Sequence, residues 1–470
     1  MNPSLVSIVR YEKPLESVRK AVDLCGGLDH LPAKARVFIK PNIVFWTRFT
    51  PFPKWGVITT SRVVEDLVHL LKERGIEDIT IGEGMVTREV KDPETPAHAF
   101  ETLGYNLLKK RYGVRVVNVL ERPFRKVDLG DGVALHFNVD FLESDFLVDL
   151  PVLKTHAQAV VSLGIKNLKG LININSRKKC HGADPQKDLH YMVGRLAKTI
   201  PPCLTVLDGI YTNERGPGFD GTIRRSNLLI ASADILSADF VGAKVLGYEP
   251  AEVPHLVHAA GIRGRQPDLS GIKVVGENIE AVAARHEYFF PYNEAGTLPR
   301  PMAEMGIRGL SYKKYDLTMC TYCSGLTRVI LMAIAKAWQG SPWDEVEILT
   351  GKAMKPTPGM KKTILLGKCM VQANKDHPDI REMIPVKGCP PSREELVRAL
   401  QGAGIEVNEK FFENMDLAPG FYLKRYAGRP EFEEALFQVS EEMEPVCRRS
   451  RSFTHPPAPS RRGRGRREVI

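Results

Sequence analysis

Short apolar runs alternate with helical patterns along the first 290 residues of the chain. The runs are rich in β-branched residues, and amphipathic stretches at residues 60–74 and 189–200 lie between some of them. Strands are predicted at residues 37–39, 79–81, 114–119, 145–153, 204–207, 228–231 and 272–275. This alternation is typical of a parallel, doubly wound sheet, so we predict an α/β domain over residues 1–290.

A smaller C-terminal α/β domain is predicted over residues 319–430, after a connector at residues 291–318 that is rich in Pro, Gly, Arg and Tyr. Its pattern predicts a helix at residues 326–338 and strands at residues 363–366 and 383–386. Ser392 and Glu395 fit a capping box, which predicts a further helix that ends near Gln401.

The overall composition is ordinary for a globular protein, with 43% apolar and 26% charged residues among 470. No apolar run approaches the roughly 20 residues that a bilayer span needs. Arg10, Glu12 and Lys13 occupy the positions where a signal peptide would carry its apolar region. We therefore expect a cytoplasmic protein without a membrane span.

The net charge of +10 is concentrated at the C-terminal end of the chain. Eight arginines and one glutamate give residues 448–470 a net charge of +7, so the rest of the chain carries only +3. This tail has almost no apolar content and is predicted to be disordered. Contacts with nucleic acid or acidic lipid are therefore expected only non-specifically, through the tail.

Four of the eight cysteines have the spacing of a metal site. Cys320 and Cys323 form a Cys-x-x-Cys motif, whereas Cys369 and Cys389 each follow an apolar, strand-like run. Four soft ligands suit a 4Fe-4S cluster, with zinc as the alternative. Zinc ligands usually come as two close pairs, and the second pair here is split, so we favour the cluster.

The predicted helices give a physical reason to expect ligands at two of these thiols. Cys323 and Cys389 are expected at helix N-termini, where the positive end of the helix dipole favours thiolate over thiol. Cys25, Cys203 and Cys447 lack comparable partners and are predicted to be core or incidental residues.

Polar residues cluster directly after the predicted strands of the first domain. In open parallel sheets the ligand crevice lies outside the carboxyl ends of the strands, so these side chains are expected to converge. They are Lys40, Asn42, Glu83, Lys154, His156 and Asp208. Lys166, Asn167 and Lys169 follow among small residues, and a group rich in lysine and histidine suits a carboxylate or phosphate ligand.

Several other polar residues have plainer interpretations. The group between positions 180 and 190 matches no known metal motif and is predicted to be structural or at the surface; its members are Cys180, His181, Asp184, Asp188 and His190. Asp208 either orients a lysine or a cation, or caps free backbone N–H groups of a turn. Asp234 is predicted to be a helix cap.

Common ligand-binding motifs are absent from the sequence. It contains no Gly-x-Gly-x-x-Gly after a strand, no Walker-type phosphate loop and no Gly-x-Ser-x-Gly elbow. Dinucleotide-binding, P-loop NTPase and α/β-hydrolase functions therefore lose support.

The order of the motifs resembles the family of domain of unknown function 362, over roughly residues 5–285. The resemblance is carried by Lys40-Pro41-Asn42, Thr59-Thr60, Gly82-Glu83, Lys154-Thr155-His156, Lys166-Asn167-Leu168-Lys169-Gly170, Asp208-Gly209, Gly216-Pro217-Gly218, Asp234 and Asp239. It implies an iron–sulfur association, because many members look like iron–sulfur proteins, often with a ferredoxin-type module. This chain lacks the closely spaced ferredoxin cysteines, which leaves the cluster type and the electron partner open.

We predict an iron–sulfur oxidoreductase that acts on an anionic small molecule in an anaerobic or low-oxygen cytoplasm, with an electron-donor protein as partner. The predicted catalytic residues are Lys154, His156 and Lys166. The predicted substrate-binding residues are Lys40, Asn42, Glu83, Asn167, Lys169 and Asp208. The predicted metal ligands are Cys320, Cys323, Cys369 and Cys389.

Two alternatives stay open. One is a non-redox isomerase or transferase with a structural metal, since the placement of lysine and histidine is loosely similar to that in nickel-dependent lactate racemases. The other is an electron carrier without a substrate of its own.

Overall fold

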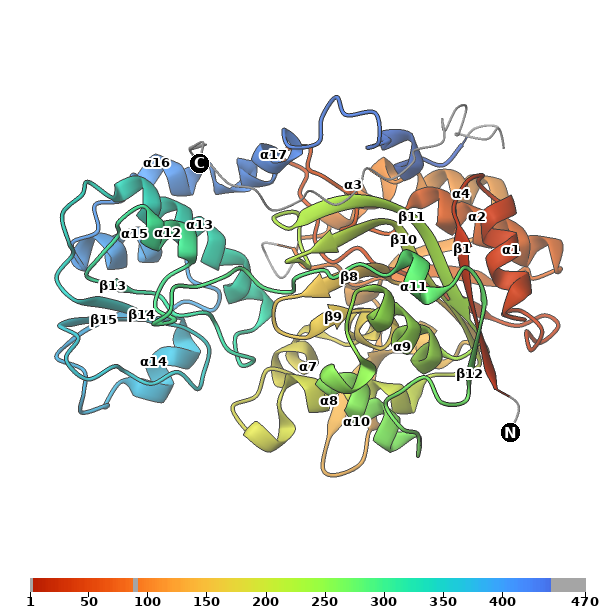
Figure 1. Cartoon of the computed structure of the whole chain (residues 1–470), viewed down its shortest axis with the longest axis horizontal. Helices are drawn as coiled ribbons and strands as arrows, with labels where there is room; N and C mark the ends of the chain where they lie inside the picture. The colour runs from red at the N-terminus through yellow and green to blue at the C-terminus, as the bar shows by residue number, and fades with distance from the viewer. Residues whose placement is uncertain (1–2, 88–91, 441–470) are drawn as a thin grey trace.

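The structure is a computed structural model that describes residues 3–87 and 92–440. The predicted tail at residues 448–470 and Cys447 lie outside the described residues. Figure 1 shows two lobes side by side, each built on its own sheet. No helix of the described residues is both long and apolar enough to cross a bilayer.

The larger lobe is built on a ten-stranded sheet with the order β12-β1-β11-β10-β7-β2-β3-β4, to which β8 and β9 attach beside β10. Five strands, up to the edge strand β4, run parallel to one another: β2 (Val37–Pro41), β3 (Ile79–Glu83), β4 (Arg115–Asn118), β7 (Phe146–Leu150) and β10 (Cys203–Glu214). At the other end, β1 (Ser4–Arg10) pairs in parallel with β12 (Ile272–Gly276). Between these two groups, β11 (Thr222–Ser232) runs antiparallel to both β1 and β10.

Successive side chains of a strand point to opposite faces of the sheet, so each face can carry its own apolar core. Helices cover both faces. On β2, Val37 and Ile39 enter one core and Phe38 enters the other. The first core also holds residues of α1 (Glu16–Leu24), α2 (Ser61–Glu73), α3 (Glu94–Thr102) and α4 (Tyr105–Tyr112). The second holds residues of α6 (Gly164–Asn167), α8 (Leu189–Arg195), α9 (Ile235–Val245) and α10 (Pro254–Ile262). The predicted doubly wound α/β fold is confirmed, with an antiparallel β10–β11 ribbon added to it.

The predicted strand at residues 145–153 is two strands in the structure. Pro151 separates β7 from β8 (Val152–His156), because proline has no N–H to continue the ladder. β8 then folds back antiparallel on β9 (Val160–Ser162). Lys154 and His156 therefore lie on a strand, and not in a loop after one.

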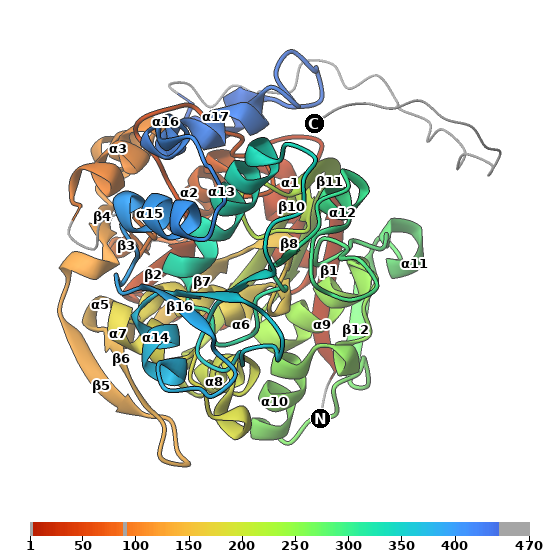
Figure 2. The same ribbon diagram turned by 90° about the vertical axis from the view of Figure 1, so that its left-hand side faces the viewer.

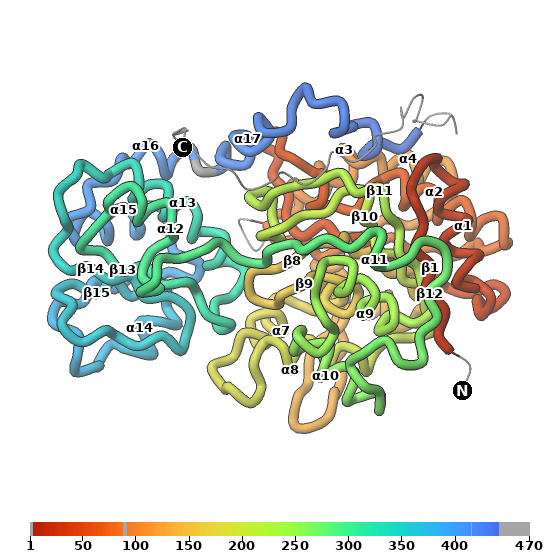
Figure 3. Tube along the Cα trace, in the orientation of Figure 1, coloured from red at the N-terminus to blue at the C-terminus, as the bar shows by residue number. Residues whose placement is uncertain are grey.

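Smaller elements complete the larger lobe. They are the hairpin of β5 (Phe124–Asp128) and β6 (Ala134–Asn138), and the helices α5 (Val139–Leu142), α7 (Ile174–Lys179) and α11 (Ile279–Val282). After α11 the chain crosses to the smaller lobe, as the tube in Figure 3 shows, and forms α12 (Arg300–Glu304).

The smaller lobe contains four parallel strands with their own apolar core, and Figure 2 turns it toward the viewer. The strands are β13 (Leu310–Ser311), β14 (Val346–Leu349), β15 (Lys362–Leu366) and β16 (Glu382–Val386). The helices are α13 (Thr321–Ala337), α14 (Lys368–Asn374), α15 (Arg393–Gly402) and α16 (Glu409–Glu413). The predicted capping box of Ser392 and Glu395 is present at the start of α15. The helix predicted at residues 326–338 starts earlier, directly after Cys320.

The chain returns to the larger lobe after α16. α17 (Ala418–Leu423) runs along the top of the view in Figure 1, and the residues after it pack into the first core of the larger lobe. Trp55 Nε1 donates to Glu433 O at 3.2 Å, and the Tyr211 hydroxyl donates to Glu431 O at 3.0 Å. Residues 418–440 therefore connect the two lobes. The predicted domain limits stay a prediction.

Candidate functional site

A buried ion pair lies at the carboxyl ends of β2 and β3. Lys40 Nζ lies 2.7 Å from Glu83 Oε2 and donates to Pro41 O at 2.6 Å, and both charged side chains are almost fully buried. Glu83 also accepts hydrogen bonds from Ile43 N at 2.8 Å and Gly84 N at 2.7 Å. The pair is thus surrounded by hydrogen bonds, as a buried pair of charges requires.

Two asparagines extend this pair into a closed network. Asn42 Nδ2 donates to Asn167 Oδ1 at 2.9 Å, and Asn167 Nδ2 donates to Asp149 Oδ1 at 2.8 Å. Lys154 Nζ donates to Asn42 Oδ1 at 2.7 Å and to Val57 O at 2.6 Å. Asn42, Asn167 and Lys154 lie far apart in the sequence and converge in the buried interior, as expected.

Burial changes the protonation of this network. Desolvation lowers the pKa of Lys40, although the charge of Glu83 opposes the change. Desolvation also lowers the pKa of Lys154 to about 7. It raises the pKa of Asp149 well above its usual range, and Asp149 Oδ2 has no hydrogen-bond partner among the described residues.

The pKa of Lys154 predicts a pH-dependent stability. Between about pH 7 and the ordinary lysine value of 10.5, the unfolded chain binds the proton and the folded chain does not, so wild-type stability rises with pH. Lys154→Met removes this contribution. We expect the wild type to gain up to about 1.4 kcal/mol per pH unit over the variant between pH 7 and 10. Urea unfolding of the wild type and the variant at pH 7 and pH 10 measures this gain. A difference in unfolding free energy that does not change with pH would contradict the prediction.

Gly170 lies against the ion pair so closely that no side chain fits there. A Cβ atom at this position would lie 2.4 Å from Glu83 Oε1 and 2.7 Å from Lys40 Cε. We expect Gly170→Ala to lower the free energy of unfolding by about 2 kcal/mol or more. Gly261→Ala is the matched control in α10, where a Cβ meets no heavy atom within 4 Å; it should be neutral or stabilise by up to about 1 kcal/mol. Equal effects in urea unfolding would contradict the steric account.

The remaining basic residues lie beside this network and are partly exposed. His156 Nδ1 accepts from Gln158 N at 3.1 Å and from Ala159 N at 3.3 Å, so the neutral ring carries its proton on Nε2. Burial lowers the pKa of His156 well below its usual range, and the charge of Lys166 lowers it further. At neutral pH this ring is therefore an uncharged N–H donor.

Lys169 forms a chain of hydrogen bonds toward the smaller lobe. His181 Nδ1 lies 2.8 Å from Leu317 O and donates to it, so its Nε2 accepts from Lys169 Nζ at 2.6 Å. Desolvation lowers the pKa of Lys169 to about 8. Sequence reasoning predicted a structural or surface role for His181, whereas the structure places it next to Lys169.

Lys166 differs from the other lysines because its Nζ makes no hydrogen bond or ion pair with any described residue. Desolvation lowers its pKa well below the ordinary value, and the charges of Lys169 and Lys154 lower it further. An anion bound here would supply the missing negative charge.

The four predicted metal ligands lie around helix N-termini of the smaller lobe. Cys320 is the N-cap of α13 and Cys323 lies in its first turn, and Cys369 lies in the first turn of α14. Cys389, which was expected at a helix N-terminus, lies in the loop directly before Ser392, the N-cap of α15, and outside the first turn of that helix. The cis peptide bond before Pro390 belongs to this loop.

The other three thiols each affect the pKa of Cys323. The Cys323 side chain, followed by backbone N–H groups, lowers the pKa of Cys320 to about 5. The side chain of Cys320 raises the pKa of Cys323, and the charges of Cys389 and Cys369 contribute to the increase. Across the described ranges, however, no three His, Cys, Asp or Glu side chains are close enough to hold a metal ion. The thiols are therefore near one another without forming a finished coordination shell.

A lysine of the larger lobe lies beside one of these cysteines, and a lysine of the smaller lobe binds the backbone next to it. Lys178 Nζ on α7 lies 3.7 Å from Cys389 Sγ and 5.4 Å from the ring centre of Tyr322. Lys352 Nζ donates to Lys178 O at 3.2 Å and also to the carbonyl of His181. Positive charge therefore lies on the side of the cysteines that faces the larger lobe.

The loop that carries Cys320 contacts the basic residues directly. Gln158 Nε2, two residues after His156, donates to Met319 O at 3.0 Å and to Asp316 O at 2.8 Å. Together with the bond from His181 to Leu317, this contact brings the cysteine loop onto the lysine cluster.

Sequence reasoning missed four residues of this site, namely Asp149, Gln158, Arg177 and His181. Arg177 donates to Ile172 O at 2.9 Å, to Gly84 O at 2.6 Å and to Gly170 O at 2.8 Å. It thus holds the backbone at Gly84 and the backbone at residues 170–172 beside Lys40. The place of Asp149 in the site could have been predicted from the sequence, because Asp149 lies opposite Lys40 on the neighbouring parallel strand. Gln158 and Arg177 act through backbone carbonyls, which a side-chain motif does not indicate.

Asp208 and Asp234 have capping geometry. Asp208 accepts from Thr60 N at 2.7 Å and Ile210 N at 3.2 Å, which fits the cap interpretation. Its predicted role in substrate binding stays a prediction. Asp234 accepts from Leu236 N at the start of α9, so the expected helix cap is confirmed.

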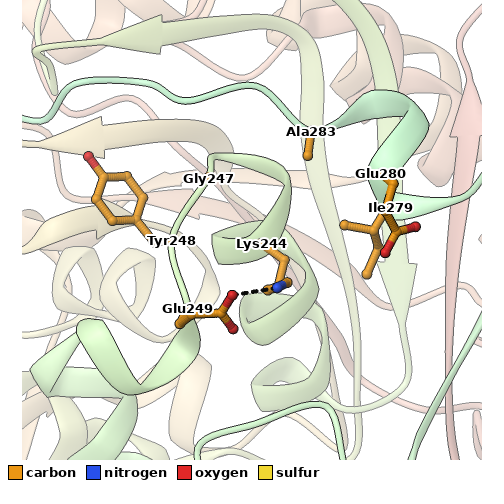
Figure 4. Close-up of a pocket in the computed structure, with 7 residues that line it drawn as sticks. All are labelled: Lys244, Gly247, Tyr248, Glu249, Ile279, Glu280 and Ala283. Carbon is orange, nitrogen blue, oxygen red and sulfur yellow. Dashed lines mark hydrogen bonds and ion pairs between the residues drawn. The ribbon is translucent and has the colours of Figure 1, made fainter.

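A hollow of about 200 Å³ lies elsewhere in the larger lobe, as Figure 4 shows. Lys244 and Glu249, which form a 2.6 Å ion pair, line it together with Tyr248 and residues of α11. None of the predicted site residues lines it.

The fold and site define an α/β protein in which residues beside a buried basic cluster contact the loop before Cys320. Residues 37–244 match the model of the family Domain of unknown function (DUF362), the family that the order of the motifs resembles.

Two similar proteins cover about half of the chain. A thylakoid-associated protein of Synechocystis sp. is 28% identical over 244 residues, which are 51% of this chain and 72% of that protein. The lactate racemase apoprotein from Thermoanaerobacterium thermosaccharolyticum matches with a TM-score of 0.31 and 14% identity. That match covers 51% of this chain and 57% of the racemase chain.

Proposed function

We propose that the protein is an iron–sulfur oxidoreductase that acts on a small anionic molecule. The observation that carries this proposal is the contact between the cysteine loop and the basic cluster, through Lys169, His181 and Leu317. An electron donor site and a substrate site at such a contact can work together without a large motion.

The four cysteines fit a 4Fe-4S cluster by the chemistry of their donor atoms. Cys320, Cys323, Cys369 and Cys389 supply four soft ligands from loops next to helix N-termini, where N–H groups and the helix dipole stabilise thiolates. When bound, such a cluster supplies single electrons. The exposed thiols of Cys369 and Cys389 leave a face for an electron-donor protein, and we place this chemistry in a low-oxygen cytoplasm.

The residues of the larger lobe would bind and orient the substrate. Lys166 and Lys169 can bind an anion, because Lys166 Nζ has no hydrogen-bond partner among the described residues and Lys169 Nζ donates to the neutral ring of His181, so that no described carboxylate neutralises either group. The Nε2–H of the neutral His156 ring can donate a hydrogen bond to the substrate. Lys40, Lys154 and Glu83 hold the surrounding backbone through their closed network, and thus position these groups.

Anion binding tests the role of the larger lobe. Inorganic phosphate and oxalate are titrated calorimetrically into the full chain, into Lys166→Met/Lys169→Met, and into a control with the exposed Lys20→Met. Each charge-assisted contact is worth about 1.5–3 kcal/mol, so we expect at least a tenfold loss of affinity in the double variant and none in the control. Equal affinities in all three proteins would overturn the assignment.

A further inference from the structure

The most exposed large apolar side chains lie on α17 and on the loop between β2 and α2. Phe421 is 56% exposed, Phe49 is 50% exposed and Leu417 is 45% exposed, and no other large apolar side chain of the described residues exceeds 39%. We call these three side chains the apolar patch. Apolar side chains that gather on the surface of a protein and are bordered by polar groups mark a site of interaction.

α17 carries apolar side chains on two sides, and only one side is covered. Residues three and four apart lie on one side of a helix, so Leu417, Phe421 and Lys424 share a side, and all three are exposed. Tyr422, on the other side, is buried. The helix therefore presents an uncovered apolar side to its surroundings.

Packing brings Phe49 to the same part of the surface. Gly420 in α17 lies so close to Thr50 that an added Cβ atom would be 2.5 Å from Thr50 Oγ1. Phe49 and Phe421 are the sequence neighbours of these two contacting residues, and both are exposed. The loop and the helix therefore contribute to one patch.

Stacked aromatic rings fix the loop and α17 to each other. The ring centre of Phe219 lies 5.3 Å from that of Phe45 in the loop and 5.4 Å from that of Tyr422 in α17. Ring pairs at such distances add stability beyond the apolar area that they bury. The apolar patch is thus held in place before any partner arrives, and docking does not need to order it.

Cationic side chains adjoin the apolar patch. The guanidinium carbon of Arg48 lies 4.8 Å from the ring centre of Phe49, and Lys424 Nζ lies 5.7 Å from the ring centre of Phe421. Arg425 follows Lys424 and is also exposed. Each exposed ring of the patch therefore has a positive charge beside it.

The acidic side chains of these segments do not cancel this charge. Glu94 forms an ion pair with Arg48, and Asp416 forms one with Arg393. Lys424, in contrast, forms no ion pair with any residue that the structure describes, and the same holds for Arg425. Unpaired positive charge therefore remains beside the patch, and it attracts a negatively charged partner.

We propose that the apolar patch is a docking surface for an anionic lipid bilayer. Apolar side chains beside lysine and arginine suit the membrane interface, because the rings enter the boundary of the acyl chains while the cations bind lipid phosphates. A stable protein–protein interface needs about 20–30 residues on each side, far more than this patch offers. α17 lies at the outer edge of the molecule in Figures 1 and 2, where a bilayer surface can reach it.

Vesicle binding tests the docking surface. The full chain, Phe49→Ser/Phe421→Ser and the control Met383→Ser, which alters an exposed side chain of the smaller lobe, are sedimented with vesicles of phosphatidylglycerol and phosphatidylcholine. We expect the control to bind like the wild type and the double variant to bind at least about tenfold more weakly, because two rings no longer enter the lipid. All three proteins carry the same basic residues 448–470. Equal binding by all three would therefore assign the binding to another part of the chain and overturn the proposal.

Lipid charge and self-association distinguish the possible occupants of the patch. Vesicles of phosphatidylcholine alone should bind the wild type at least about tenfold more weakly, because they lack the negative charge that Lys424 and Arg425 attract. A wild type that binds no anionic vesicles would overturn the proposal. A wild-type dimer in sedimentation velocity that Phe49→Ser/Phe421→Ser abolishes would assign the patch to a second copy of the chain, and the lipid assignment would be wrong.

A fluorescent variant tests insertion without removing an apolar side chain. Phe421→Trp keeps an aromatic ring at an exposed position, so the fold is expected to be unchanged. Its emission in excess of the wild type should move to shorter wavelength when anionic vesicles are added, because the indole ring leaves water. An excess emission that does not move would show that the ring stays in water, and would overturn the proposal.

Discussion

Lys40→Met is expected to lower the free energy of unfolding by about 3–5 kcal/mol, because removal of one partner leaves the other charge buried and unpaired. Lys40 and Glu83 are almost fully buried and 2.7 Å apart. After the substitution, Glu83 would keep its hydrogen bonds from Ile43 N and Gly84 N but lose its counter-charge. Equilibrium urea unfolding measures the difference.

Two controls separate charge burial from loss of packing. Lys40→Met/Glu83→Leu removes both charges and should recover much of the loss. Asp145→Ala removes an exposed ion pair with Arg36 and should cost no more than about 1 kcal/mol. An effect of Lys40→Met as small as that of Asp145→Ala would contradict the buried-pair account.

Cys369→Ala and Cys389→Ala are each expected to abolish the iron–sulfur absorbance of the anaerobically purified protein, because a 4Fe-4S cluster uses four cysteine thiolates. Both thiols are exposed, so alanine at either position leaves the apolar core intact. Visible absorbance before and after dithionite and bound iron measure the result.

Cys203→Ala is the matched control for these variants. Cys203 is buried at the start of β10 and is not one of the four clustered cysteines. It should keep the full iron content. Iron retained in both Cys369→Ala and Cys389→Ala would contradict the assignment of these ligands.

Most of the fold was predictable from the pattern of the chain. The strands at β2 and β3 and the helix α2 lie where alternating and helical apolar spacing places them, because each buries one defined face. The β10–β11 ribbon was not predictable as antiparallel, since the apolar runs at residues 204–207 and 228–231 each have the composition of a buried parallel strand. Its two long strands pair through a turn whose geometry the apolar pattern does not encode.

The candidate site was predictable where its polar residues lie at or directly after the end of a predicted strand. Lys40, Asn42, Glu83 and Lys154 converge because the strand ends of a parallel sheet meet at one edge. The contact between His181 and Leu317 was beyond sequence reasoning, because it joins residues 136 positions apart from different lobes. Nothing in the local pattern around His181 encodes how the two lobes meet.

The different states of the lysines also depend on tertiary structure. Lys154 and Lys166 each follow an apolar residue in the sequence, yet Lys154 donates to Asn42 and Val57 whereas Lys166 Nζ has no hydrogen-bond partner among the described residues. The number of partners of each lysine is a property of the folded chain.

The composition of the metal centre tests the central claim most directly. The full chain is purified without oxygen, and iron, acid-labile sulfide and zinc are quantified per chain. The account predicts about four iron and four sulfide, with a visible spectrum that bleaches on reduction. A colourless protein with stoichiometric zinc and no sulfide would contradict it, and would leave the basic cluster as the site of a reaction without electron transfer.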